Sequence, residues 1–386
     1  MIGGRHDARF EAVRDAFHRN FAERGEIGAS LCIYVDGRAV VDLWGGYADQ
    51  AKTHPWRPET LVAIFSVGKA ITALCAHQLV DRGKLDLDAP VSRYWPEFAA
   101  QEKAGVTIRQ LLSHRAGLPA IREPLPQDAM LNWSVMTKAL AGERPWWPPG
   151  SRHGYHVNTF GYLVGEVVRR ITGRSLGSFV SDEIAGPLGA DFYIGLAQTA
   201  GARIADFVWG ETPAIPSDEP VSEEQRMIRN AYVNPPGLSG IGWVNWPAWR
   251  AAEIPSTNGH ATARGVARIY AALAAGGSID GVRIIGCDAL GEAVREHSAG
   301  YDAVLKRPSR FGLGFQLARP SDQRGAGGYL PPGLGPAAFG HLGVGGSVGF
   351  ADPDARVAFG YVMNAMGPRW NNPRPRALIE ALYDCL

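Results

Sequence analysis

A segment of mostly small and apolar residues between Ile64 and Val80 constrains the fold of this chain more than any other segment. The run is rich in good helix formers, and Gly83, a residue that commonly ends helices, follows it closely. It therefore predicts a helix from Ser66 to Arg82. Because apolar residues lie on both sides of this helix, we expect it to be buried inside the protein.

Two segments near opposite ends of the chain predict β-hairpins. Near the N-terminus, the apolar runs 29–35 and 40–44 flank Asp36-Gly37, a dipeptide typical of two-residue hairpin turns. Near the C-terminus, a second hairpin is predicted across the turn at 352–355. Strands at both ends with helices between them predict an α+β fold. In this fold one antiparallel sheet is built from both termini and flanked by helices, with a mostly helical middle region.

The remaining pattern predicts further helices and suggests how the chain is divided. Periodic apolar residues predict helices over residues 7–24, 158–172, 262–276 and 374–386. We expect a short turn region at 183–189 and a long loop over the proline-interrupted segment 206–230. The expected regions are an α/β part at 1–90, a mostly helical insert at 91–250 and a second α/β part at 251–386. A site would lie in a cleft between such regions.

Composition argues against several classes of function. The formal net charge is +1 and there is no basic run, so nothing marks the chain as a binder of nucleic acid or of an anionic membrane. No segment approaches the ~20 apolar residues that are needed to span a bilayer. The first residues contain no apolar core of a signal peptide, so we expect a cytoplasmic protein.

Ser66 and Lys69 are the first candidate catalytic residues. They are three positions apart, so a helix places them on the same face. A serine hydroxyl beside an amine is a compact way to make a nucleophile. The alternative is a serine that caps the helix and is followed by a solvated lysine. A lysine in the first turn opposes the helix dipole, however, and burial would favour the neutral amine that can act as a base.

Two later segments add candidate groups. Tyr155 follows Pro149-Gly150 on a loop just before the helix predicted at 158–172. It can accept or relay a proton beside Ser66, or it can be an aromatic anchor for its loop. The glycine-rich segment 340–349 lets a substrate approach backbone N–H groups closely, or it forms a β-bulge or a tight bend.

Three motifs in this order resemble those of the serine β-lactamase and penicillin-binding-protein superfamily. They are the S-x-x-K of Ser66 and Lys69, Tyr155 after Pro-Gly, and the His-x-Gly that begins at His341. Within the superfamily the chain looks most like the esterases related to class C β-lactamases, the family VIII carboxylesterases. Segments 83–91 and 107–118 also look like signatures of this group, and the resemblance covers most of residues 20–386.

The resemblance implies a β-lactamase-like fold and a set of catalytic roles. Ser66 would be the acylated nucleophile, and Lys69 and Tyr155 together would form the general base. The backbone N–H groups of Ser66 and Val344 would form the oxyanion hole. The resemblance implies no metal and no organic cofactor, and the expected partner is a small-molecule ester. It leaves the oligomeric state open.

The substrate-binding residues implied by the resemblance are His341, Gly343 and Val157, and here the chain departs from the family pattern. Tyr-x-Asn is replaced by Tyr155-His156-Val157, with Asn158 displaced by one position, and Lys-Thr-Gly is replaced by His341-Leu342-Gly343. In the family, the asparagine and the lysine that are replaced here help to bind β-lactams, so a neutral ester is expected to fit this site better. The alternatives are a β-lactamase, a D-amino acid amidase or peptidase, an acyl transferase and a non-catalytic scaffold.

Other patterns carry weaker hypotheses. Ser347 lies in a G-x-S-x-G sequence, but a strand and turn are predicted after it, so we interpret it as structural. His153 and His156 have no carboxylate partner nearby in the sequence, so we interpret them as structural too, and not as metal ligands. Several tryptophans can line an acyl pocket or belong to the core and a lid: Trp146, Trp147, Trp243, Trp246, Trp249 and Trp370.

Overall fold

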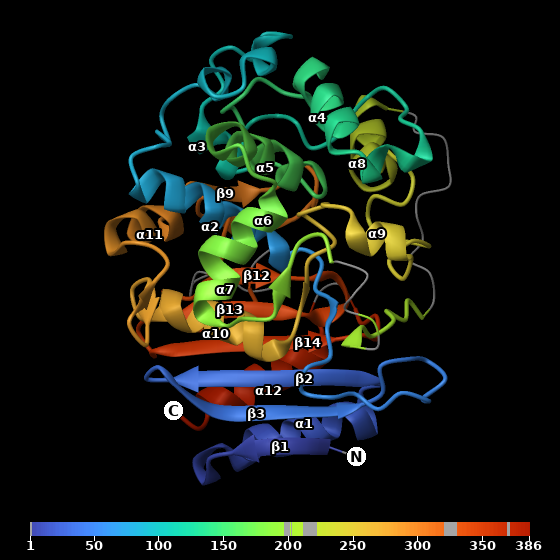
Figure 1. The fold of residues 1–386 in the computed structure, drawn as a ribbon, viewed down its shortest axis with the longest axis vertical. Coiled ribbons are helices and arrows are strands. Elements are labelled where there is room, and N and C mark those ends of the chain that lie inside the picture. The colour runs from blue at the N-terminus through green and yellow to red at the C-terminus, as the bar shows by residue number, and fades with distance from the viewer. Residues whose placement is uncertain (1, 197–200, 202, 211–221, 320–329, 369–370) are drawn as a thin grey trace.

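The centre of the protein is a nine-stranded antiparallel sheet with the strand order β1-β3-β2-β14-β13-β12-β11-β10-β9 (Figure 1). The computed structural model describes residues 2–196, 201, 203–210, 222–319, 330–368 and 371–386. The strands are β1 (Ile2–His6), β2 (Gly28–Val35), β3 (Arg38–Gly46), β9 (Ser298–Tyr301), β10 (Pro308–Phe311), β11 (Gln316–Leu317), β12 (Phe339–Leu342), β13 (Val348–Asp352) and β14 (Val357–Met363). Because β2 pairs with β14, the two ends of the chain meet in one sheet, which confirms the predicted α+β class.

Both predicted hairpins are present, and their turns explain their register. Asp36 and Gly37 have φ values of +50° and +75°, as the tight two-residue turn between Val35 and Arg38 requires. In the second hairpin Asp352 pairs with Val357 across a four-residue connection. The residues of the two turns therefore fix the register between β2 and β3 and between β13 and β14.

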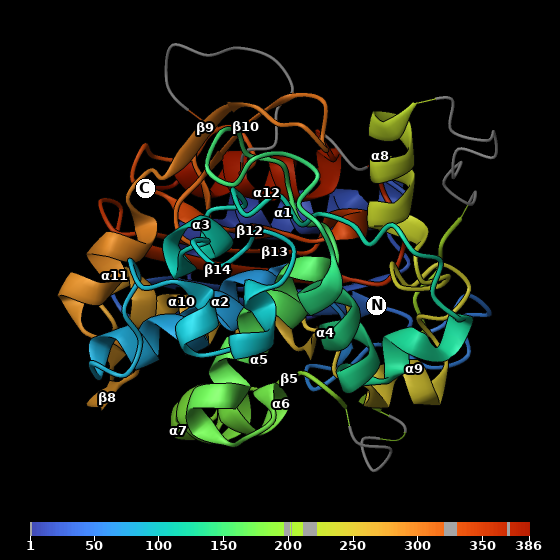
Figure 2. The same cartoon turned by 90° about the horizontal axis from the view of Figure 1, so that it is seen from above.

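Helices cover both faces of this sheet, as Figure 2 shows from above. α1 (Glu11–Glu23) and α12 (Pro373–Tyr383) pack against each other on one side. α10 (Ala263–Ala274) packs against β2, β13 and β14 on the other side, where α2 (Val67–Asp81) also lies. α2 is buried along nearly its whole length, because α5, α6, α11 and β12 surround it. The predicted burial of this helix is thus confirmed.

The middle of the chain is mostly helical. Its helices are α3 (Ile108–Leu112), α4 (Trp133–Gly142), α5 (Thr159–Thr172), α6 (Leu176–Val180), α7 (Gly186–Leu188), α8 (Glu223–Val233) and α9 (Pro247–Ala251), and α11 (Cys287–Val294) follows later. A small sheet joins β4 (Val62–Ala63), β6 (His260–Ala261) and β5 (Phe192–Tyr193), and β7 (Ser278–Ile279) pairs with β8 (Val282–Arg283). The division at residues 90 and 250 remains a prediction. Among the described helices, none combines the length and the apolar character that crossing a bilayer requires.

Two predicted loop segments are wrong. Residues 183–189 were expected to be a turn, but a π-helical turn at Ser181–Ala185 continues directly into α7. The loop expected over 206–230 contains the first two turns of α8, while residues 211–221 lie outside the described residues. The prolines that suggested a loop end at Pro220. After them Ser222 accepts a hydrogen bond from the Gln225 N–H and caps a helix with two acidic residues in its first turn.

Candidate active site

The backbone before Ser66 holds this residue in a sharp turn. Phe65 has a φ of +48°, a left-handed conformation that is unusual for a bulky residue. Its ring packs edge-on against Phe207 at 4.8 Å and Trp209 at 5.8 Å between ring centres, which keeps the strained residue in place. Ser66 directly precedes α2, but its side chain makes no capping hydrogen bond to the helix. The Ser66 hydroxyl is therefore not used as a helix cap.

Lys69 is fully buried beside this hydroxyl. Its Nζ donates to Ser66 Oγ at 2.9 Å and to the Ser256 carbonyl oxygen at 2.9 Å. The Ser256 hydroxyl in turn accepts a hydrogen bond of 2.7 Å from the Gly161 N–H in α5. The alternative of a solvated lysine is wrong, since the ammonium or amine group is held between a serine hydroxyl and a backbone carbonyl.

Tyr155 lies against the same lysine, with Lys69 Nζ 4.9 Å from the centre of the tyrosine ring. The ring stacks on Phe311 at 5.8 Å between centres. The backbone N–H of Tyr155 donates to both carboxylate oxygens of Asp302, at 3.0 and 3.1 Å. Asp302 is fully buried and also accepts hydrogen bonds from the Val304 N–H, the Leu305 N–H and the Ser309 hydroxyl. A buried carboxylate thus fixes the loop that carries Tyr155.

His341 is buried beside Tyr155, and its tautomer follows from its contacts. Its Nδ1 lies 2.8 Å from the Leu342 carbonyl oxygen, which can only accept, so Nδ1 carries the proton. Nε2 then faces the Tyr155 hydroxyl oxygen at 3.5 Å as an acceptor. Burial, reinforced by the nearby charge of Lys69, lowers the pKa of His341 to about 3. His341 is therefore a neutral ring and not a cation at neutral pH.

The glycine-rich segment passes close to the backbone just before Ser66. A Cβ on Gly343 would lie 2.3 Å from the Ile64 carbonyl oxygen, so only glycine allows this approach. The Gly343 N–H donates to the Ser347 carbonyl oxygen at 2.7 Å and closes a tight bend. Val344 follows this bend and lines the same cavity as Ser66. The tight bend, one of the two alternatives, is present, while the approach of a substrate to the N–H groups of this segment remains a prediction.

The cavity at Ser66 has a volume of about 120 Å³. Its lining combines aromatic and aliphatic side chains with a few hydroxyl and amide groups: Phe65, Ser66, Tyr155, Val157, Asn158, Trp209, Tyr232, Ser239, Ile241, Thr257, Val344 and Met366. Val157 lies in this lining, whereas Gly343 and His341 do not. Asn158 uses its amide to donate to the Ala231 carbonyl and the Ser239 hydroxyl, and its Oδ1 accepts from Thr257.

Sequence reasoning missed several residues of the site. Trp209 lines the cavity although it was not among the tryptophans considered, whereas Trp147 and Trp249 are buried in the core. Trp370 lies outside the described residues. Ser256 and Asp302 were also missed. Asp302 accepts from the N–H groups two and three positions on, so its sequence context signals only a turn and not a contact with Tyr155.

The remaining histidines near Tyr155 make structural hydrogen bonds. The backbone N–H of His156 donates to His114 Nδ1 at 3.2 Å, and the backbone N–H of Leu118 donates to His156 Nε2 at 3.0 Å. His153 Nε2 lies 2.9 Å from the Ser309 hydroxyl. Across the described ranges there is no group of three or more His, Cys, Asp or Glu side chains arranged to hold a metal ion. The polar side chains that lie together at Ser66 are hydroxyl, amine and neutral imidazole groups, which can exchange protons.

Comparisons with known proteins identify the family and the relatives of this chain. The family model described as Beta-lactamase matches residues 13–383. The chain is 35% identical over 378 residues to the Esterase/beta-lactamase LipL of Mycobacterium tuberculosis, covering 95% of this chain and 83% of that protein. Two solved structures each cover 100% of both chains. One is a family VIII carboxylesterase with 40% identity and a TM-score of 0.90. The other is a penicillin-binding protein homologue from Caulobacter crescentus with 39% identity and a TM-score of 0.89.

Proposed function

The chain belongs to the β-lactamase family, and we propose that it cleaves carboxylic esters through an acyl-enzyme on Ser66. The observation that carries the proposal is the buried contact of 2.9 Å between Lys69 Nζ and Ser66 Oγ. A hydroxyl held this close to an amine can lose its proton as it attacks, which is how weak nucleophiles are activated.

The proposed acylation step uses groups that lie together around the cavity. Ser66 Oγ attacks the ester carbonyl carbon while Lys69 and Tyr155 take its proton. The carbonyl oxygen becomes an oxyanion, and the backbone N–H groups of Ser66 and Val344 stabilise it. As the tetrahedral intermediate collapses, the C–O bond to the leaving alcohol breaks and the alcohol receives the proton. In the second half of the reaction, water attacks the carbonyl carbon of the acyl-enzyme in the same way, and the carboxylic acid and free Ser66 are released.

Several features support an ester over a β-lactam as substrate. His341 stands where related enzymes carry a lysine, and because its pKa is lowered to about 3 it offers no positive charge to a carboxylate. The Asn158 amide is already engaged by Ala231 and Ser239. Phe65, Trp209 and Met366 give the cavity an apolar wall that suits a short acyl group.

The test compares hydrolysis of p-nitrophenyl butyrate and nitrocefin by the unmodified protein and by Ser66→Ala. Ser30→Ala is the matched control, because Ser30 is a buried serine whose hydroxyl has no hydrogen-bond partner in the described part of the chain. We expect ester turnover that vanishes only in Ser66→Ala, with little opening of nitrocefin.

The other outcomes separate the alternatives. Strong turnover of nitrocefin by the unmodified protein would favour a β-lactamase, the second activity named for LipL. A rate that is the same in Ser66→Ala as in the unmodified protein would refute the acyl-enzyme on Ser66. If neither substrate is hydrolysed in a Ser66-dependent way, the esterase proposal is wrong, and an amidase, an acyl transferase or a scaffold remains.

A further inference from the structure

A buried ion pair joins the two ends of the chain beneath the glycine-rich segment. Arg374 Nη1 donates to Glu26 Oε1 at 2.8 Å, and the two side chains are 3% and 0% exposed. The Tyr361 hydroxyl donates to the second oxygen of the Glu26 carboxylate. Burying two charges costs desolvation energy that their attraction often fails to recover. We therefore ask which other group this ion pair holds in place.

The second arm of the Arg374 guanidinium reaches the glycine-rich segment. Its Nη2 donates to the Ala365 carbonyl oxygen at 2.9 Å and lies 3.5 Å from the Gly345 carbonyl oxygen. The same Gly345 oxygen accepts from Asn372 Nδ2 at 2.9 Å and from the Gly367 N–H at 3.1 Å. Three donors from the C-terminal segment thus converge on one carbonyl group.

This carbonyl belongs to the residue directly after Val344. Gly345 has a φ of +89°, and a Cβ there would lie 2.7 Å from Met363 Cε. On the other side of Val344, the Gly343 N–H is bonded to the Ser347 carbonyl oxygen. Val344 therefore lies between two glycines whose backbone groups are both held by hydrogen bonds.

We propose that Glu26 and Arg374 are positioning residues that hold the Gly345 carbonyl and thereby aim the Val344 N–H at the oxyanion. This inference rests on the proposed function, because the oxyanion forms only during acyl transfer. Arg374 binds the carbonyl, and Glu26 fixes the rotation of the guanidinium by binding its other arm. Neither residue touches the substrate.

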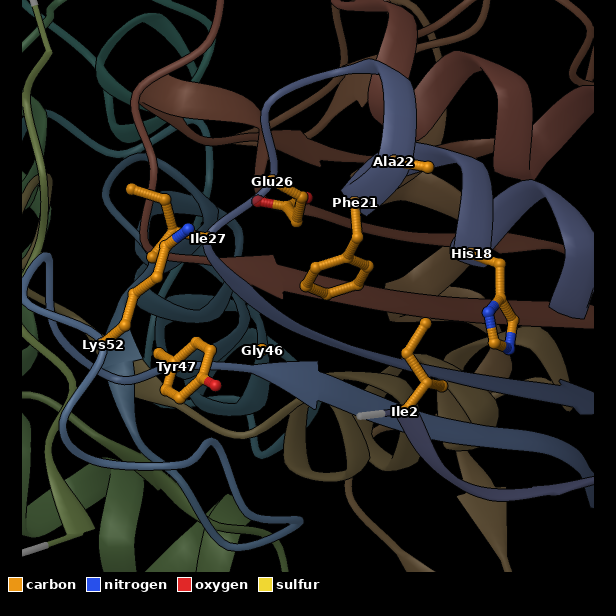
Figure 3. A pocket seen from close by; sticks show the side chains of 9 residues that line it. All are labelled: Ile2, His18, Phe21, Ala22, Glu26, Ile27, Gly46, Tyr47 and Lys52. Atoms are coloured by element: carbon orange, nitrogen blue, oxygen red, sulfur yellow. The ribbon is translucent and has the colours of Figure 1, made fainter.

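The packing behind Glu26 is consistent with a fixed carboxylate. Together with Phe21 and Ile27, Glu26 borders a cavity of about 450 Å³ on the side of α1 and β2 (Figure 3). Figure 3 shows the Phe21 and Ile27 side chains flanking the carboxylate. Lys52 and His18 also border this cavity, but the ion pair of Glu26 is with Arg374, at 2.8 Å between Nη1 and Oε1.

The test measures kcat and KM for p-nitrophenyl butyrate in two variants. In Arg374→Met, we expect kcat to fall about 10-fold with KM nearly unchanged, less than the 10²–10³-fold loss of a whole oxyanion donor. The fall is partial because Asn372 and Gly367 still bind the carbonyl. The double variant Glu26→Gln/Arg374→Met removes both charges of this pair, so its melting temperature should exceed that of the single variant while its kcat stays low.

The control is Glu166→Gln, which breaks another buried carboxylate–arginine contact, with Arg169 and Arg170 in α5. It should lower the melting temperature and keep kcat. If kcat recovers in the double variant together with the melting temperature, or if kcat never falls, the positioning role is refuted while Ser66-dependent hydrolysis stands. If the unmodified protein shows no Ser66-dependent hydrolysis, the proposed function fails, and the positioning role fails with it.

Discussion

Acidification should destabilise this protein steeply, because five fully buried histidines are neutral in the folded state. Burial is the main cause in each case. It lowers the pKa of His77 and His156 to about 4, that of His260 and His341 to about 3, and that of His114 well below its usual value. In the unfolded chain these rings have the ordinary pKa of about 6.5.

The sign and size of the effect follow from proton binding. Below pH 6.5 these histidines bind protons in the unfolded chain, whereas in the folded protein His77 and His156 bind them only at about pH 4. The folded state is therefore destabilised as the pH falls. One such histidine costs about 1.4 kcal/mol per pH unit, or about 2 kcal/mol at pH 5. Five together cost about 10 kcal/mol, which is comparable with the entire stability of about 5–15 kcal/mol of a typical protein.

The assay is urea unfolding at pH 7.5, 6.5 and 5.5, followed by circular dichroism in both the unfolding and the refolding direction. His77→Gln should reduce the loss of stability between pH 7.5 and 5.5 by about 1.3 kcal/mol in total, and the amide can still donate to the Leu313 carbonyl oxygen. The exposed His18→Gln is the matched control and should keep the original slope. A free energy of unfolding that stays constant between pH 7.5 and 5.5 would refute the reasoning, as would an unchanged slope in His77→Gln.

Three further predictions concern the site. Tyr155→Phe should lower kcat for p-nitrophenyl butyrate at least about 100-fold with little change in KM, as expected for a lost proton-transfer group; an unchanged kcat would make Tyr155 a loop anchor. Trp209→Ala should enlarge the cavity and favour longer p-nitrophenyl esters over butyrate, and an unaltered chain-length profile would contradict its role as a wall. Gly345→Ala should lower the melting temperature, because a Cβ at φ +89° would lie 2.7 Å from Met363 Cε; equal melting temperatures would show that the bend tolerates a side chain.

The parts of the fold that could be predicted are those with local causes. The turn at Asp36-Gly37 follows from residues that accept positive φ, and α2 and α5 follow from apolar periodicity and a glycine at the end of each pattern. Helix α8 was missed because prolines precede its cap so closely. The short strands β10 and β11 were missed because two to four residues carry no periodic signal and depend on their neighbours for pairing.

The sequence by itself determined the contact between Ser66 and Lys69, because one turn of helix brings residues three apart onto one face. Tertiary structure alone decided what surrounds them. Ser256 reaches Lys69 from 187 positions away, and Asp302 holds Tyr155 from 147 positions away. Such contacts depend on how sheets and loops pack, and no local pattern encodes a partner that lies far away in the sequence. Each of these groups had to find its partner within the fold, because an unpaired polar group inside the protein is costly.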